Sequence, residues 1–86
     1  MKLNPLAVMT EQGDGTGLVF DPATNWAISL NPVGVHLWKQ LKNGADESVL
    51  ISFLLDRYEN ITKERAAADV QAFLSKLRSR SLLLDS

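Results

Sequence analysis

Short apolar runs separated by turn residues fill the first third of the chain. The run Leu6–Thr10 is followed by residues 11–17, which hold three of the five glycines and an Asp-Gly step typical of a hairpin. A second β-rich run, Leu18–Phe20, stops at an Asp-Pro pair that favours a turn. Residues 26–30 then alternate, with Trp, Ile and Leu on one face and Ala and Ser on the other. The pattern predicts a three-stranded antiparallel meander.

The remaining two thirds of the chain has helical periodicity in three segments, each with a start signal. Asn31 precedes a proline suited to the first helical position, and Asp46 and Thr62 are caps for the second and third segments. The first segment ends at an Asn-Gly pair, because glycine accepts the positive φ required there. The expected buried stripes are Val33, Leu37, Trp38 and Leu41, then Leu50, Ile51, Leu54, Leu55 and Tyr58, and finally Ala66, Val70, Phe73, Leu74 and Leu77.

Together these elements predict an α+β fold in which three helices cover one face of the sheet. A three-stranded sheet cannot stand alone in water and must bury one face on other elements. The expected order is β-β-β-α-α-α, a three-stranded sheet followed by a winged-helix-like three-helix bundle, and Leu82–Leu84 is expected to pack back on the core. With 86 residues and no repeat or linker, one domain over residues 1–86 is expected.

Composition narrows the class of protein. The hydrophobic fraction of 45% and the charged fraction of 22% are those of an ordinary globular domain. The chain has no cysteine, which excludes disulfides, thiolate metal sites and a cysteine nucleophile. No apolar run reaches the roughly 20 residues of a membrane span, and the N-terminus has no signal-peptide core. We therefore expect a cytoplasmic protein that does not contact membranes.

No set of residues in the sequence has the composition of an active site. The single histidine, His36, has no cysteine partner and lies among apolar positions of the first helical segment. The glycine-rich stretch 13–17 is not followed by a helix with a lysine, so a hairpin turn explains it better than a phosphate cradle. We therefore predict a non-enzymatic protein without catalytic residues, metal or cofactor.

Nucleic-acid binding needs separate consideration because three helices also occur in helix-turn-helix proteins. Residues 62–80 hold five basic and two acidic residues, whereas the formal charge of the whole chain is −1. The basic residues lie at the two ends of the third helical segment, and its middle, Ala67-Ala68-Asp69, is poor in base-reading groups. The sequence predicts no nucleic-acid partner, although a DNA-binding regulator stays an alternative.

A spaced set of residues resembles a known family. The set is Leu18-Val19-Phe20-Asp21, Ile28-Ser29-Leu30-Asn31, Val33-Gly34, Leu37-Trp38, Gly44, Leu54, Tyr58, Asp69-Val70, Phe73-Leu74, Leu77 and Leu82-Leu83. In order and spacing it resembles the pyrroloquinoline quinone biosynthesis protein D (PqqD) family, whose module is also called the RiPP recognition element, after ribosomally made, post-translationally modified peptides. The resemblance runs from about residue 6 to residue 84.

The resemblance implies a function as well as a fold. Members of the family are non-catalytic peptide chaperones that bind the leader of a precursor peptide and bring it to a modifying enzyme, commonly a radical SAM enzyme. The leader adds to the sheet beside the third strand, in the groove against the third helix. In such β-augmentation, backbone hydrogen bonds supply affinity and side-chain pockets supply selectivity. The implied partners are a leader peptide and such an enzyme, and no cofactor is implied.

Carried onto this sequence, the resemblance assigns a peptide-binding edge and a helical wall. The edge is Trp26, Ala27, Ile28, Ser29 and Leu30, and the wall comes from Asp69, Val70, Phe73, Lys76, Leu77 and Arg80. Without the resemblance, Ile28, Leu30, Val70, Phe73 and Leu77 are better explained as core and Lys76 and Arg80 as a solvated face, whereas Trp26 suits the sheet end and the groove equally. Lys76 and Arg80 would suit acidic residues in a leader. Ile28→Pro is expected to abolish peptide binding through loss of a ladder donor.

The chain departs from the family pattern at three turn or cap positions. Asn25 and Ser81 stand where glycine is frequent, and Asn43 replaces a frequent aspartate. These departures affect turns and caps only, so the expected fold is unchanged. The sequence does not identify whether the pathway is pyrroloquinoline quinone biosynthesis or the synthesis of another modified peptide. Two alternatives stay open: a small protein-interaction subunit without leader recognition, and a helix-turn-helix DNA-binding regulator. An exposed strand edge also leaves a homodimer open.

Overall fold

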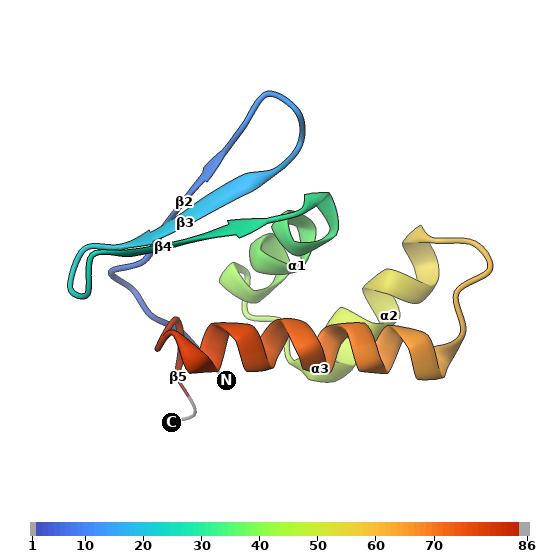
Figure 1. The fold of residues 1–86 in the computed structure, drawn as a ribbon. Helices are drawn as coiled ribbons and strands as arrows, with labels where there is room; N and C mark the ends of the chain where they lie inside the picture. The colour runs from blue at the N-terminus through green and yellow to red at the C-terminus, as the bar shows by residue number, and fades with distance from the viewer. Residues whose placement is uncertain (1, 85–86) are drawn as a thin grey trace.

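The predicted meander forms one sheet in the computed structural model, which describes residues 2–84. Its strands are β2 (Val8–Glu11), β3 (Gly17–Asp21) and β4 (Trp26–Leu30), antiparallel in the order β2-β3-β4. Side chains alternate along β3 and β4, so one face of the sheet is buried and the other is exposed. The buried face is turned toward the helices, which lie on one side of the sheet (Figure 1).

Helix α1 (Pro32–Lys42) begins where the sequence predicts. The Oδ1 atom of Asn31 accepts a hydrogen bond from the backbone N–H of Gly34 at 2.8 Å, and Pro32 is the first helical residue. Gly44 has a φ of +93°, the left-handed conformation expected after a helix C-terminus. Because Asn31 follows the last residue of β4 and caps α1, the chain turns directly from the strand into the helix, and the end of β4 is fixed beside the start of α1.

Helices α2 (Glu47–Arg57) and α3 (Lys63–Ser79) are capped by the predicted residues. Asp46 Oδ1 accepts from the Val49 N–H at 3.0 Å, and Thr62 Oγ1 accepts from the Arg65 N–H at 3.1 Å. Each cap satisfies a backbone donor that the first helical turn leaves without an intrahelical partner. Helix α3 is the long helix that runs past both α1 and α2 (Figure 1).

The core lies between the inner face of the sheet and the three helices. All five predicted stripe residues of α3 are buried, as are Leu37, Trp38 and Leu41 of α1. Leu55 of α2 differs from the prediction, because its side chain is 37% exposed while Leu50 and Leu54 are buried. The buried hydrophobic residues are Val19, Ile28, Leu30, Val35, Leu37, Trp38, Leu41, Leu50, Leu54, Ala66, Val70, Phe73, Leu74, Leu77, Leu82 and Leu83.

A close contact between β3 and α1 depends on a glycine. A Cβ atom added at Gly17 would lie 2.8 Å from Val35 Cγ2 and 3.0 Å from Met9 Sδ. These separations are too short for carbon and sulfur atoms, so any larger residue would push the sheet away from α1. Gly17 therefore sets how closely the sheet and the first helix pack.

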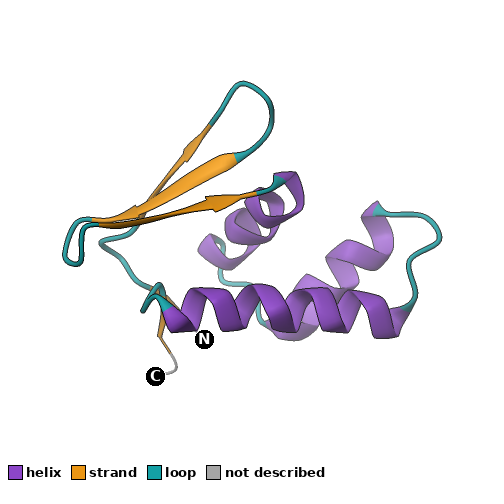
Figure 2. Ribbon diagram, in the orientation of Figure 1, coloured by secondary structure: helices purple, strands orange, loops and turns teal. Residues whose placement is uncertain are grey.

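The chain ends pair in a second sheet that the sequence analysis does not predict. Strand β1 (Lys2–Leu3) is antiparallel to β5 (Leu83–Leu84), with Leu3 opposite Leu83. Leu82 and Leu83 are buried, as expected for a tail packed on the core. Both strands have only two residues, too few for a periodic pattern, and they lie next to the C-terminal end of α3 (Figure 2).

Candidate functional site

Strand β4 has a free edge. It pairs with β3 on one side, and no other strand within residues 2–84 pairs with its second side. A strand at the edge of a sheet presents N–H and C=O groups that can pair with another chain. The edge therefore offers a place where an extended segment can add to the sheet.

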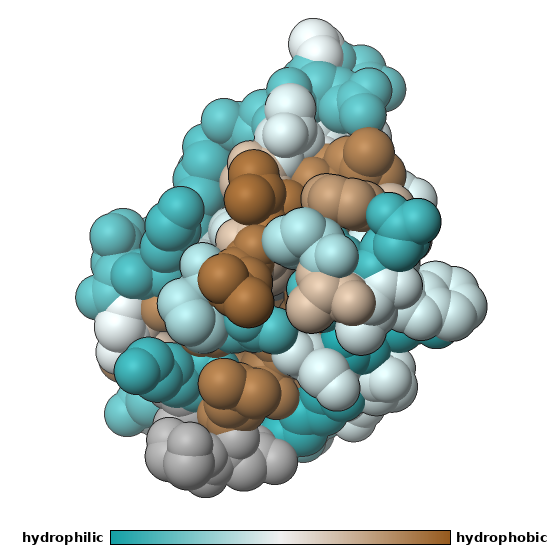
Figure 3. Space-filling view, turned by 90° about the vertical axis from the view of Figure 1, so that its left-hand side faces the viewer, coloured by the Kyte–Doolittle hydropathy of each residue, from teal (hydrophilic) through white to brown (hydrophobic). Residues whose placement is uncertain are grey.

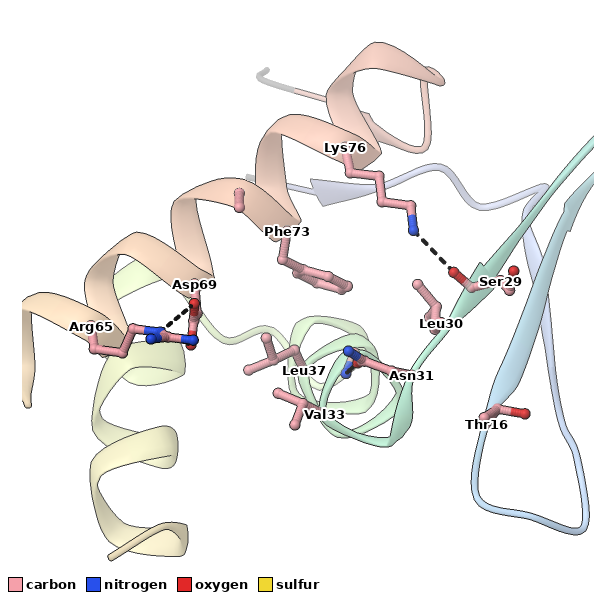
Figure 4. Close-up of a pocket in the computed structure, with 12 residues that line it drawn as sticks. Thr16, Ser29, Leu30, Asn31, Val33, Leu37, Arg65, Asp69, Phe73 and Lys76 are labelled. Atoms are coloured by element: carbon pink, nitrogen blue, oxygen red, sulfur yellow. Dashed lines mark hydrogen bonds and ion pairs between the residues drawn. The ribbon is translucent and has the colours of Figure 1, made fainter. Parts of the chain in front are cut away.

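The orientation of that edge follows from one hydrogen bond. Lys76 Nζ of α3 donates to the carbonyl oxygen of Ser29 at 3.0 Å, so the Ser29 carbonyl is directed away from β3 (Figure 4). Backbone direction alternates along an antiparallel strand, so the peptide groups of Ala27 also face the open side while those of Ile28 face β3. The donors available to an added strand are therefore the N–H groups of Ala27 and Ser29. Ile28, the position chosen from sequence for a proline test, donates toward β3.

A cavity of about 740 Å³ lies between the end of β4, the start of α1 and one side of α3. This volume is in the range of ligand-binding pockets in proteins. Phe73 and Leu37 point into the space, with Ser29 and Leu30 on the strand side (Figure 4). The residues that line it are Thr16, Ser29, Leu30, Asn31, Val33, Gly34, Leu37, Arg65, Asp69, Ala72, Phe73 and Lys76. We call this cavity, together with the free edge of β4, the β4–α3 groove.

The polar wall of the groove comes from α3. Arg65, Asp69, Ala72 and Lys76 recur every three or four residues and so form one row along the helix. Arg65 Nε lies 3.2 Å from Asp69 Oδ1, an ion pair on the helix surface. Their charges offset each other. Lys76 has no carboxylate partner within the described residues, so the wall has a net positive charge at its end beside Ser29.

A second cavity of about 320 Å³ continues the groove toward the turn between α2 and α3. The two cavities share Val33, Arg65 and Asp69. Tyr58 and Ile61 line the far end of the smaller one. An extended segment lying on the edge of β4 could therefore continue past the end of the strand over an apolar floor.

The opposite end of the edge carries an aromatic–cation pair. The guanidinium carbon of Arg80 lies 4.2 Å from the ring centroid of Trp26, close enough for a cation–π contact. Trp26 is 53% exposed although its position in the alternation matches those of buried Ile28 and Leu30. It lies at the start of β4 and covers the C-terminal end of α3 through this contact.

Five of the eleven sequence-predicted peptide-binding residues line the cavity: Ser29, Leu30, Asp69, Phe73 and Lys76. Ala27 lies on the exposed edge, and Trp26 and Arg80 form the pair at its far end. The other three, Ile28, Val70 and Leu77, are buried core residues and take no part in the lining. The helical repeat explains this, because Val70 and Leu77 face inward when Asp69 and Lys76 face the strand.

Several lining residues were missed by the sequence analysis: Thr16, Asn31, Val33, Gly34, Leu37, Arg65 and Ala72. Arg65 and Ala72 had a readable signal, because they continue the Asp69–Lys76 row at helical spacing. Thr16 and the α1 residues had none, since only the folded chain brings their elements together. Within residues 2–84, no cluster of acidic and histidine side chains is arranged to hold a metal ion. No helix in that range is both long and apolar enough to cross a membrane.

Two solved structures have this fold. TbiB1 in complex with the TbiA(beta) leader peptide superposes with a TM-score of 0.90 at 21% identity, covering 100% of this chain and 98% of that chain. Lasso peptide synthetase B1 complexed with the leader peptide superposes with a TM-score of 0.84 at 20% identity, covering 98% of this chain and 96% of that chain. At such identities the likeness concerns the fold. No curated protein sequence matches the chain.

The family comparison covers two strands of the sheet, β3 and β4, and all three helices. The model of the family described as coenzyme PQQ synthesis protein D (PqqD) matches residues 17–83, more than three quarters of the 86 residues. The match begins at β3 and ends in β5, so it includes both sides of the β4–α3 groove. The chain belongs to the PqqD family.

Proposed function

We propose that this protein binds the leader of a ribosomally made precursor peptide and holds it for a modifying enzyme, without catalysing a reaction itself. The observation that carries the proposal is the free edge of β4 facing the wall of α3 across a cavity. The two solved structures compared above are complexes with a leader peptide, which supports the proposal.

The groove has the two parts that β-augmentation needs. Ala27 and Ser29 each offer one N–H and one C=O, so a leader strand can form up to four backbone hydrogen bonds with β4. Net backbone bonds contribute about 0.5–1.5 kcal/mol each, which gives affinity with little regard to sequence. Apolar leader side chains would contact Leu30, Val33 and Phe73, and these contacts would set register and selectivity.

The modifying enzyme needs a second contact surface on the protein. The outer face of the sheet exposes apolar side chains of β2 and β3, namely Val8, Leu18 and Phe20. One side of the molecule shows several apolar patches among polar residues (Figure 3). Because a leader on the edge of β4 would extend this sheet, an enzyme resting on its outer face would contact protein and leader together. We propose this face for the enzyme, with a radical SAM enzyme as the first candidate.

The exposed outer face also gives the protein-interaction alternative a specific basis. A subunit without leader recognition would bind a folded partner through Val8, Leu18 and Phe20 and leave the groove empty. DNA binding has less support, because the two basic residues of α3 that line the groove have partners within the protein. Arg65 pairs with Asp69 and Lys76 bonds to Ser29. A recognition helix needs such groups free for phosphates and bases.

An amide NMR titration with leader peptides encoded by neighbouring precursor genes tests the proposal. We expect shifts at residues 27–31 and along the Arg65–Lys76 row, with the outer face of the sheet unchanged. Titration of duplex DNA at low and moderate salt is the matched negative control. Shifts confined to β2 and β3, or none with any leader, would favour the protein-interaction alternative instead.

A further inference from the structure

Lys76 occupies the edge that the proposed leader would use. Its ammonium group donates to the Ser29 carbonyl, one of the acceptors directed to the open side of β4. An added strand would place one of its own N–H groups at this acceptor, since strand pairing uses the same lone pairs. The free protein therefore holds a side chain where a backbone donor of the peptide would lie.

The surroundings of Lys76 decide what happens when the contact breaks. The side chain is exposed, and the carboxylate on the same wall, Asp69, is already paired with Arg65 at 3.2 Å. Within residues 2–84 no ion pair joins a carboxylate to Lys76. A displaced ammonium group would then face the peptide with its charge uncompensated.

We propose that Lys76 is a displaceable cap on the β4 edge that selects leader strands with a carboxylate opposite it. The proposal rests on the proposed function and adds a residue and a peptide chemistry to it. In the free protein, Lys76 of α3 covers the Ser29 carbonyl and so occupies one of the open groups through which an edge strand pairs with other chains. In the complex, the leader N–H replaces it, and a leader Asp or Glu accepts the ammonium group in a charge-assisted hydrogen bond.

The charge of the groove matches this choice. Arg65 and Lys76 line the α3 side of the cavity with Asp69 as the acidic residue among them, 2 − 1 = +1, and Arg80 lies at the far end of the β4 edge, although the whole chain has a formal charge of −1. A strand without a carboxylate leaves the ammonium group to water, which costs little, so the selection is graded. We expect up to about fivefold tighter binding of acidic strands, the range of an exposed ion pair.

The first experiment tests the cap without any peptide. The ¹³C chemical shift of the Ser29 carbonyl is measured in the free wild-type protein and in Lys76→Met, Lys76→Arg and Lys63→Met. Lys63 is an exposed lysine in the first turn of the same helix and serves as the matched control. We expect the shift to change in Lys76→Met, to be retained in Lys63→Met and to be largely restored in Lys76→Arg. An unchanged carbonyl in Lys76→Met would overturn the cap.

The second experiment tests the selection with a displayed library of random peptides. Wild type, Lys76→Met and Lys76→Glu are each used to select binders, with Lys63→Met as control. We expect wild type and Lys63→Met to enrich Asp and Glu at one position of the selected peptides. This enrichment should disappear with Lys76→Met, and Lys76→Glu should enrich Lys or Arg at that position instead. Equal carboxylate frequencies in all pools would overturn the selection while leaving peptide binding intact. Failure of every form to select a peptide would overturn the proposed function and the acidic selection together, and the carbonyl shift would still decide the cap.

Discussion

Ser29→Pro separates edge pairing from every other role of β4. The N–H of Ser29 points to the open side, so proline removes no bond of the β3–β4 ladder. The preceding residue, Ile28, is already extended, which is the conformation that a following proline requires. The carbonyl of Ser29 and its contact with Lys76 are kept. We expect a folded variant that has lost one donor of the leader-receiving edge.

The expected loss of affinity follows from the groups involved. The leader loses one backbone hydrogen bond, about 0.5–1.5 kcal/mol, and its carbonyl is left facing the proline ring without a partner, which adds about 1–3 kcal/mol. Partial relief by water limits the sum to about 1.5–3 kcal/mol. This corresponds to about 10-fold to 150-fold weaker binding, at tenfold for each 1.4 kcal/mol.

Fluorescence anisotropy with a labelled leader peptide measures the effect, and thermal unfolding confirms that each variant is folded. Ser29→Ala is the control, because it keeps the N–H and is expected to bind close to wild type. Ile28→Pro is expected to unfold the sheet, since its N–H faces β3. An affinity of Ser29→Pro equal to that of Ser29→Ala would refute pairing at the β4 edge and move the binding site elsewhere.

Three further predictions concern stability. Gly17→Ala should destabilise the fold by about 1–3 kcal/mol in urea unfolding, because its Cβ would overlap Val35, whereas Gly13→Ala at an open position should not. Burial, followed by the charges of Arg57 and Lys39, lowers the pKa of His36 below 6.5. As the pH is lowered, His36 of the unfolded chain therefore becomes protonated at a higher pH than His36 of the folded chain. Stability should therefore fall as pH drops through about 6.5 toward the folded pKa, and a His36→Gln variant with the same slope would contradict this. Trp26→Ala should cost about 0.5–1 kcal/mol through its contact with Arg80, and an equal cost in an Arg80→Ala background would exclude the coupling.

The helix boundaries and the meander are the parts of the fold that local sequence predicts. Asn31, Asp46 and Thr62 each cap the helix that the pattern predicts, because a cap is made by residues three positions apart. The third helix buries all five predicted residues, since one face of a long amphipathic helix is marked several times over. The family resemblance added a binding edge, and the match to the PqqD family confirms the resemblance.

Other features depend on contacts between distant segments. The β1–β5 pair joins residues about 80 positions apart, and two residues a strand leave no periodic trace. The lining of the groove combines the β2–β3 turn, the start of α1 and one row of α3, and no single element encodes that combination. Val70 and Leu77 were grouped with the binding wall, yet the rotation of α3 against the core directs them inward.

The sequence by itself determined the elements, their ends and the apolar faces, because these arise from hydrogen bonds and periodicities within a few residues. Tertiary structure alone decided which peptide groups of β4 remain open. That choice follows from the register of β4 on β3, which places Ser29 opposite Leu18, and from α3, which brings Lys76 to the Ser29 carbonyl. Ser29 and its neighbour Ile28 thus differ in function, because the backbone groups of Ser29 face the open edge and those of Ile28 face β3.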